Sequence, residues 1–395
     1  MPDDTAGRPP HPQSRQTAGR PPFECIALLL QGGGALGAYQ AGVYEALTEA
    51  DLHPDWVAGI SIGAINAAII AGNPAAERVA KLRAFWEGIT ANPLTDWAGS
   101  APYLTPQGDW ARKIFNEFSA ASTLFQGVAG FFQLRQPAPW LHPDGMLSAT
   151  SFYDASLLKQ TLERVIDFDR LNSGKTRLSV GAVNVRSGNF IYFDTTKQAI
   201  HPEHIMASGA LPPGLPAVEI DGEHYWDGGL ISNTPLQWVV NSHPRQDTLA
   251  IQVDLWSARG EFPANLTEVA TRQKEIQYSS RTRAGTDQFK ELQRLRHALA
   301  SLLHKLPEDL RDSEEAQTLS SAADYKVYSV IQLIHRSKHY EGNSRDYEFS
   351  RLTMREHWRS GYNDAVRTLR HPQVLARPTD ANGVFTFDLA EDGRE

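Results

Sequence analysis

The sequence is poor in cysteine, with Cys25 alone among 395 residues. A single cysteine excludes an internal disulfide and a cysteine-rich metal site. Because Cys25 lies in an apolar run, we expect it to act as a small buried hydrophobe and not as a reactive thiol. Such sparse use of cysteine suits a cytoplasmic protein. We expect that location, together with peripheral contact at a membrane.

Long apolar runs are also missing. The longest, Cys25 to Leu30, is far shorter than the roughly 20 residues that cross a bilayer. Residues 1–22 are rich in Pro, Gly, Arg and Gln and contain no apolar core. The sequence therefore predicts a disordered segment over residues 1–22, and no signal peptide.

A positive charge balance and close metal-ligand spacings are absent as well. The net charge of −8 argues against nucleic acid as the main partner. Among 13 histidines there is no His-Glu-x-x-His pattern, and the pair His201 and His204 is too weak a signal for a metal ion. We therefore predict no metal ligand and no cofactor. Hydrophobic residues at 41% are typical of a soluble globular protein with a core.

The most informative stretch that is present is Gly59-Ile60-Ser61-Ile62-Gly63. It follows the apolar run Trp56–Ala58 and precedes Ala64–Ala71, which is typical of a buried helix. A strand, a tight turn and a helix form the context of a nucleophile elbow. The following helix would direct its free N–H groups at an oxyanion formed on the serine. Taken alone, these five residues also fit an ordinary turn that contains a serine.

A glycine-rich loop follows the first expected strand, Cys25–Leu30. The loop, Gly32-Gly33-Gly34-Ala35-Leu36-Gly37, opens a helix expected to end at Ala50. Bare backbone N–H groups in such a loop suit an anion. Two functions fit: an oxyanion hole, or a dinucleotide-binding turn with Asp51 or Asp55 as the ribose-binding acid. An elbow serine on the next strand favours the oxyanion hole.

The third stretch, Asp227-Gly228-Gly229, ends an expected hairpin. Aspartate is common in turns, so this pattern carries little weight alone. Beside the loop and the elbow, Asp227 becomes the candidate base for Ser61, because no histidine occupies an obvious triad position. A carboxylate with a pKa of about 3.9 is a weak base towards serine, and desolvation would strengthen it.

Two regions raise hypotheses about lipid contact. Residues 92–147 are rich in aromatic residues without a clean period, and fit either a packed insertion or a cap that meets acyl chains or a membrane. The charged stretch Leu266–Lys305 predicts a long helix that packs its leucines on the core and exposes its charges to water. Alternatively, its excess of basic residues would form a face that binds anionic lipid. The leucine stripe consists of Leu292, Leu295, Leu299, Leu302, Leu303 and Leu306.

Other periodic segments complete the expected fold. Strands are predicted at 177–185, 189–194, 248–254 and 325–334, and helices at 74–90, 154–166 and 349–369. We therefore expect an α/β protein with a mostly parallel central sheet sandwiched by helices. The expected domains are a catalytic domain at 23–263, with an insertion or cap at 92–147, and a mainly helical C-terminal extension at 264–395.

The loop, the elbow and the Asp-Gly-Gly step, in this order, resemble the patatin-like phospholipases. The resemblance covers roughly Cys25 to Val240. It implies a patatin-like three-layer fold and a serine acyl-ester hydrolase of lipids that uses a Ser61–Asp227 dyad and an acyl-enzyme. It also implies an oxyanion hole at Gly32, Gly33, Gly34, Ala35 and Ile62, and supporting roles for Gly37, Gly59, Gly63, Gly228 and Gly229. Many members carry Arg or Lys where this chain has Leu36, which removes a positive charge near the site.

The expected substrate is a lipid or long-chain acyl ester, of the kind cleaved by phospholipases, lysophospholipases or lipases. Two other functions stay open. A lipid-binding or scaffolding protein of the same fold would keep the aromatic insertion and the basic extension without an activated serine. A dinucleotide-binding oxidoreductase would use the glycine loop for its cofactor.

Overall fold

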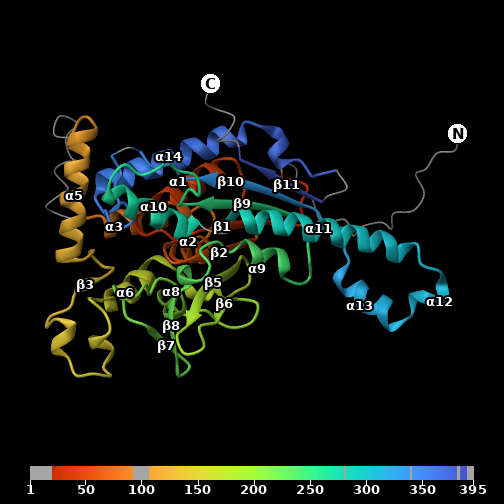
Figure 1. Cartoon of the computed structure of the whole chain (residues 1–395), viewed down its shortest axis with the longest axis horizontal. Helices are drawn as coiled ribbons and strands as arrows, with labels where there is room; N and C mark the ends of the chain where they lie inside the picture. The colour runs from red at the N-terminus through yellow and green to blue at the C-terminus, as the bar shows by residue number, and fades with distance from the viewer. Residues whose placement is uncertain (1–19, 92–105, 280–281, 339, 380–382, 389–395) are drawn as a thin grey trace.

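A computed structural model describes residues 20–91, 106–279, 282–338, 340–379 and 383–388 (Figure 1). Most of the expected disordered segment and the first part of the aromatic insertion lie outside the described residues. None of the described helices is long and apolar enough to span a bilayer.

A central sheet organises the chain, with strand order β11-β10-β9-β1-β2-β5-β8-β7 and β6 paired to β5. The parallel strands are β1 (Cys25–Leu30), β2 (Trp56–Ile60), β5 (Arg177–Asn184), β9 (Thr248–Asp254), β10 (Tyr328–Ile334) and β11 (Val384–Phe387). The antiparallel strands are β6 (Phe190–Asp194), β7 (Val218–Ile220) and β8 (Glu223–Asp227). The prediction of a mostly parallel α/β sheet is therefore confirmed.

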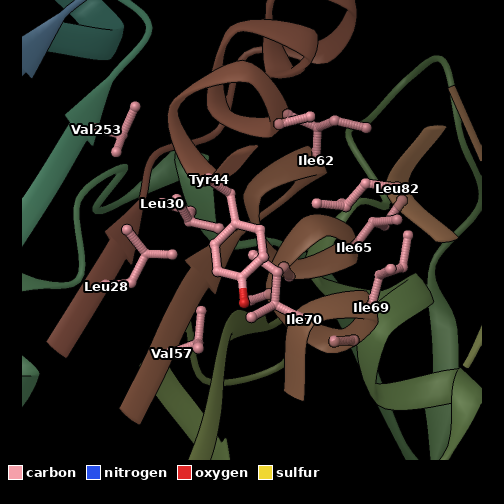
Figure 2. Close-up of a cluster of buried hydrophobic side chains, with 14 of the residues drawn as sticks. Leu28, Leu30, Tyr44, Val57, Ile62, Ile65, Ile69, Ile70, Leu82 and Val253 are labelled. Carbon is pink, nitrogen blue, oxygen red and sulfur yellow. The ribbon is translucent and has the colours of Figure 1, made fainter. Parts of the chain in front are cut away.

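Both faces of the sheet are buried, because consecutive side chains of a strand point to opposite faces. In β1, Ile26, Leu28 and Leu30 join one hydrophobic cluster, and Cys25, Ala27 and Leu29 join the other. Figure 2 shows part of the first cluster, where Leu28, Leu30 and Val57 face Tyr44 and the isoleucines of the helix after Ser61. Cys25 is buried, as expected for a small hydrophobe.

Helices cover the two faces to give three layers (Figure 1). The first face carries α1 (Ala38–Glu49), α2 (Ile62–Ala71), α3 (Arg78–Ile89), α6 (Ser156–Val165), α8 (Pro202–Ser208) and α14 (Arg351–Leu369). The second face carries α9 (Leu236–Asn241) and part of α11 (Thr282–His304). Shorter or peripheral helices are α7 (Phe168–Leu171), α10 (Leu266–Ser279), α12 (Glu308–Arg311) and α13 (Glu314–Ala322).

The C-terminal part of the chain extends the same sheet. β10 pairs in parallel with β9, from Tyr328 opposite Thr248 to Ile334 opposite Asp254, and β11 pairs with β10. The segment from Pro372 onward contains a short 3-10 helix at Pro372–Leu375 and β11. The division into a catalytic domain and an extension at residue 264 stays a prediction about the sequence. In space, the two parts share one sheet.

The leucine stripe of α11 does not form the buried face that the sequence predicts. Leu295 and Leu302 are 56% and 58% exposed, whereas Gln293 and Arg296 are buried. The Gln293 amide donates to Asp324 and to the Lys326 carbonyl, and the Arg296 guanidinium donates to Asn241. These partners satisfy the buried polar groups, so the polar stripe can pack inward. The prediction of leucines on the core is wrong for Leu292, Leu295 and Leu302, whereas Leu299, Leu303 and Leu306 are half-buried.

The aromatic insertion contains a helix that its sequence did not reveal, α5 (Asp109–Gln126), followed by a small antiparallel pair, β3 (Gln133–Leu134) with β4 (Tyr153–Asp154). α5 is also reversed, because Arg112 and Asn116 are buried while Trp110 and Phe125 are 77% and 76% exposed. The Arg112 guanidinium forms an ion pair with Glu356 of α14 at 2.8 Å. In Figure 1, α5 stands at the opposite end of the molecule from α12 and α13.

Close packing of α1 on α14 gives a test of the fold. A Cβ at Gly42 would lie 1.8 Å from the Trp358 carbonyl oxygen, so Gly42→Ala must push the two helices apart. We expect a loss of about 2–3 kcal/mol in the free energy of unfolding, measured by urea denaturation. The matched control is Gly88→Ala in α3, where a Cβ meets nothing within 4 Å. Helix propensity should make that variant slightly more stable, and equal stability of the two variants would contradict this packing.

Candidate active site

Ser61 lies on a strained turn between β2 and α2. Its backbone has φ 56° and ψ −126°, a region that non-glycine residues rarely occupy and that costs about 1–3 kcal/mol. Cβ atoms at Gly59 and Gly63 would lie 2.3 Å from the carbonyl oxygens of Gly63 and Leu30, so neither position accepts a side chain. The expected elbow geometry of this stretch is therefore present, and its two glycines have a steric reason.

A residue that the sequence did not single out holds this turn in place. The Ser208 hydroxyl accepts a hydrogen bond from the Ser61 backbone N–H at 2.9 Å and donates one to the Gly181 carbonyl at 2.6 Å. Ser208 is fully buried at the end of α8. A lone serine in a short helix carries no sequence signal for such a role.

The sheet register brings Asp227 beside Ser61. In the parallel pairing of β2 and β5, Ile60 lies opposite Gly181, and in the antiparallel pairing of β5 and β8, Ala182 lies opposite Asp227. Ser61 follows Ile60 directly, so residues 61 and 227 flank the same position of β5. The two side chains line one cavity.

Burial makes Asp227 a stronger base than a free aspartate. Its side chain is 3% exposed, and desolvation raises the pKa of the carboxyl to about 6. Hydrogen bonds from the Ser61 hydroxyl and from the Gly229 N–H oppose this rise. The Gly229 bond measures 2.7 Å, so the Asp-Gly-Gly step supplies a donor that orients the carboxylate.

The glycine loop is fixed by side chains from later in the chain. Asn233 accepts a hydrogen bond from the Gly32 N–H at 3.1 Å and donates to the Gly32 carbonyl at 3.0 Å. The Trp256 indole also donates to that carbonyl, and the Gln31 side chain accepts from the Leu255 and Trp256 N–H groups. Nothing in the sequence indicates this role of Asn233, because one asparagine after a turn carries no signal for contact with a loop about 200 residues away.

Only some of the expected oxyanion-hole amides are available. The Gly32 N–H binds Asn233, and the Ala35 N–H donates to the Asp346 carbonyl at 2.8 Å. Within the described part of the chain, the N–H groups of Gly33, Gly34 and Ile62 have no hydrogen-bond acceptor. Gly34 has φ +55°, and a Cβ there would lie 2.1 Å from the Asp346 oxygen, so glycine is required. The expected oxyanion hole thus narrows to three donors.

Other motif glycines serve close packing. A Cβ at Gly37 would lie 2.6 Å from Ile62, and one at Gly228 would lie 2.7 Å from the Gly181 carbonyl oxygen. Leu36 is fully buried.

A cavity of about 240 Å³ opens beside Ser61. Ser61, Asp227, Gly229, Asn233 and the glycine loop form its polar end. The rest of its wall is mostly apolar. The apolar and aromatic lining residues are Ile62, Ile65, Leu124, Phe131, Phe132, Tyr153, Leu211, Leu215, Trp256, Tyr278, Tyr347 and Phe349, and Thr123, Gly209, Gly214 and Asp346 complete the wall. Tyr278, Tyr347 and Phe349 belong to the C-terminal extension. No lysine or arginine lines the cavity among the residues that the structure describes.

The dinucleotide-binding alternative requires a ribose-binding carboxylate near the glycine loop, and neither Asp51 nor Asp55 lies there. Asp55 accepts a hydrogen bond from the Ile26 N–H at 2.8 Å, which places Asp55 at the amino ends of β1 and β2. Asp51 follows α1 at the same edge and contacts His53. The glycine loop lies at the carboxyl end of β1, so neither carboxylate can bind a ribose held there.

The His201 and His204 pair has a structural role. The His204 Nδ1 accepts a hydrogen bond from the His201 N–H at 2.9 Å, and its Nε2 contacts Gln198 at 3.0 Å. Both ring nitrogens of His204 are therefore engaged, and the pair closes the first turn of α8.

A parallel α/β sheet that carries a serine on a strained strand-to-helix turn has the architecture of α/β serine hydrolases. The sequence model described as patatin-like phospholipase matches residues 28–239, more than half of the chain, and one described as patatin phospholipase matches residues 276–381. The chain belongs to the patatin-like phospholipase family, a family of lipid hydrolases. The resemblance inferred from the three motifs is thus confirmed.

Curated relatives cover only part of the chain. It is 36% identical over 123 residues to uncharacterized NTE family proteins of Mycobacterium tuberculosis and Mycobacterium bovis. The match covers 31% of this chain and 20% of each relative, so the chain spans about a fifth of their length.

Solved structures show more distant similarity. VipD from Legionella pneumophila is 14% identical with a TM-score of 0.40, and the alignment covers 96% of this chain and 77% of VipD. The type III effector protein ExoU is 15% identical with a TM-score of 0.31, covering 90% of this chain and 54% of the effector.

Proposed function

We propose that this protein is a serine acyl-ester hydrolase of lipids in which Ser61 is the nucleophile and Asp227 the base. The observation that carries the proposal is that Ser61, in a strained backbone conformation, lines the same cavity as the buried carboxyl of Asp227, and that the Ser61 hydroxyl acts to lower the pKa of that carboxyl. A serine that had only a packing role would gain nothing from that strain.

The reaction runs through an acyl-enzyme. The Ser61 oxygen attacks the ester carbonyl carbon as its proton passes to Asp227, which gives a tetrahedral oxyanion. The oxyanion collapses, the bond to the alcohol breaks, and Asp227 returns its proton to the leaving oxygen. Water then attacks the acyl-enzyme with Asp227 again as the base, which releases the fatty acid and restores the serine hydroxyl.

The N–H groups of Gly33, Gly34 and Ile62 are the proposed donors to the oxyanion. Their lack of other acceptors supports this role, since donors without an acceptor lower the energy of a negative charge that develops next to them. The N-terminus of α2 begins at Ile62 and adds the positive end of its dipole.

The cavity supports a long acyl chain as the group that is bound. Its wall consists mostly of leucine, isoleucine and aromatic side chains, which gain free energy when they exclude water against an alkyl chain. Because no basic side chain lines it among the described residues, we propose that recognition rests on the acyl chain and the carbonyl and not on a phosphate inside the cavity.

Substitution of either member of the dyad tests the mechanism. We expect Ser61→Ala and Asp227→Asn to lower kcat/KM for a long-chain p-nitrophenyl ester by about a thousandfold or more, because the two residues act as a unit. A fluorophosphonate probe should label wild type and not Ser61→Ala. Ser187→Ala, at an exposed turn, is the matched control. Unchanged hydrolysis in Ser61→Ala would reject the assignment, and a folded wild type that resists the probe would favour the non-catalytic lipid-binding alternative.

The raised pKa of Asp227 sets a pH dependence. The carboxyl accepts a proton only when ionised, so activity should be lost as pH falls through the pKa of about 6. We expect kcat/KM for a neutral ester to be level above about pH 7 and to fall tenfold per unit well below pH 6. Circular dichroism at each pH must show a folded protein. A rate that stays level down to about pH 4.5 would mean that Asp227 is not the base.

We also propose that the protein docks on lipid surfaces through the aromatic face of α5, which consists of Trp110, Ile114, Phe118 and Phe125. All four side chains are exposed, and Leu124 of the same helix lines the cavity. Trp140 and Leu141, on the segment that follows, are 75% and 67% exposed. Exposed aromatic groups beside a substrate cavity are typical of a surface that meets lipid.

The basic stretch that first suggested anionic lipid supports docking less well. Lys274 pairs with Asp346 at 2.7 Å and Arg272 with Glu275 at 2.9 Å, while Arg296 is buried. Lys274 and Arg272 are therefore paired with carboxylates, Arg296 is not available at the surface, and the apolar surface of α5 is the stronger candidate.

Removal of two aromatic groups tests this docking. The double variant Trp110→Ser with Phe125→Ser should sediment with phosphatidylcholine and phosphatidylglycerol vesicles about tenfold more weakly or worse, because each buried aromatic is worth roughly 1.5–3 kcal/mol. Hydrolysis of a short soluble ester should not change. The control is Leu295→Ser with Leu302→Ser on α11, which removes apolar surface elsewhere. Equal loss in both double variants would contradict a specific docking face.

A further inference from the structure

Three buried side chains with metal-binding chemistry meet outside the cavity. They are His335, directly after β10, Glu341 in the following loop, and His357 on α14. Each is at most 7% exposed, and their ligand atoms all lie within 4.8 Å of one another. Two imidazoles and one carboxylate form a donor set that divalent transition metals prefer.

The distances between the donors fit a shared metal better than hydrogen bonds. The Glu341 Oε2 lies 3.3 Å from the His335 Nε2, a long hydrogen bond, and 3.4 Å from the His357 Nε2, which has no hydrogen-bond partner. A charge-assisted hydrogen bond would be about 2.7–2.9 Å. Two ligands on a tetrahedral ion with metal bonds of about 2.0–2.1 Å are separated by about 3.3–3.4 Å. The carboxylate oxygen thus stands at ligand spacing from both imidazoles.

The cluster also leaves polar atoms without partners. Both ring nitrogens of His357 and the Nδ1 of His335 are buried and have no hydrogen-bond partner among the residues that the structure describes. A closed network of hydrogen bonds would satisfy these atoms, since an unpaired buried polar group costs about 1–3 kcal/mol. Glu348, buried next to the start of α14, keeps its Oε2 without a partner as well, and its charge acts on His357. It could accept from a ligand imidazole as an outer carboxylate.

We propose that His335, Glu341 and His357 bind a divalent transition metal ion of the zinc type. Three protein ligands leave a fourth position for the second Glu341 oxygen or for water. The ligands come from the end of β10, from a loop and from the second turn of α14, so one ion would link three separate elements. The site is independent of the proposed hydrolase mechanism, which uses no metal.

The ion would also stiffen one wall of the substrate cavity. The loop from His335 to Ser350 carries Asp346, whose carbonyl accepts the Ala35 N–H, and Tyr347 and Phe349, which line the cavity. His335 and Glu341 lie at the start of this loop, and His357 lies one and a half turns into the helix that follows it. Binding at the cluster would therefore restrict the loop at both of its ends.

Metal analysis of the intact protein tests the proposal. Untagged full chain is stripped with EDTA, dialysed against Zn²⁺ and freed of excess ion. We expect one zinc per chain in wild type and in the control His304→Ala, an exposed histidine, and roughly a hundredfold weaker binding in Glu341→Gln and His357→Ala. Co²⁺ should give wild type, and not Glu341→Gln, the strong visible absorption of four-coordinate cobalt.

A thermal measurement keeps the test decisive if a variant folds poorly. Zinc should raise the Tm of wild type after EDTA treatment, because an ion that binds only the folded chain stabilises it, and should leave the Tm of Glu341→Gln unchanged. Wild type that binds no zinc and shows no shift in Tm would overturn the proposal. Zinc retained equally by wild type and Glu341→Gln would place the ion elsewhere and overturn it too.

Discussion

Parallel pairing of β1, β2 and β5 aligns their carboxyl ends, and the chemistry of this protein depends on that alignment. The glycine loop leaves β1, Ser61 leaves β2, and β5 carries the position that Asp227 flanks from β8. α2 can begin at Ile62 only because Gly63 allows its backbone to approach the end of β1. A shift of one residue in any of these pairings would separate the serine from the carboxylate and turn every strand side chain to the other face.

Burial at this edge has opposite effects on stability and on chemistry. The desolvation that raises the pKa of Asp227 disfavours its ionised form, and the strained conformation of Ser61 also costs free energy. The surrounding structure offsets both costs with hydrogen bonds to fixed groups: Ser208 to the Ser61 backbone, Gly229 to Asp227, and Asn233 to Gly32. These residues contact the reacting groups or their backbone. Only Gly229 belongs to the three motifs that first indicated the function, and Ser208 and Asn233 lie outside them.

The C-terminal part of the chain folds together with the part that carries the three motifs. It adds β10 and β11 to the sheet, packs α14 on α1, supplies Tyr278, Tyr347 and Phe349 to the cavity, and contains all three residues of the His335, Glu341 and His357 cluster. The Asp346 carbonyl also accepts a hydrogen bond from the Ala35 N–H, which the motif alone would leave free to bind an oxyanion. A glycine loop defined in the first tenth of the chain thus has its free donors selected by a carbonyl near the end of the sequence.

Local patterns in the sequence determined most strands of the central sheet, the strand-to-helix turn at Ser61, the three motifs and the family, because each depends on residues adjacent in the chain. They did not reveal β3, β4 or β11. Tertiary structure alone decided which face of an amphipathic helix is inward. In α5 and α11, several large apolar side chains face outward, while Arg112, Gln293 and Arg296 are buried and find partners on distant elements. Asn233, Ser208 and the cluster at His335 also depend on tertiary structure, and the cluster spacings of 6 residues (His335 to Glu341) and 16 residues (Glu341 to His357) match no short ligand pattern. Periodicity records that two faces differ, and only the partners available in space determine which one is buried.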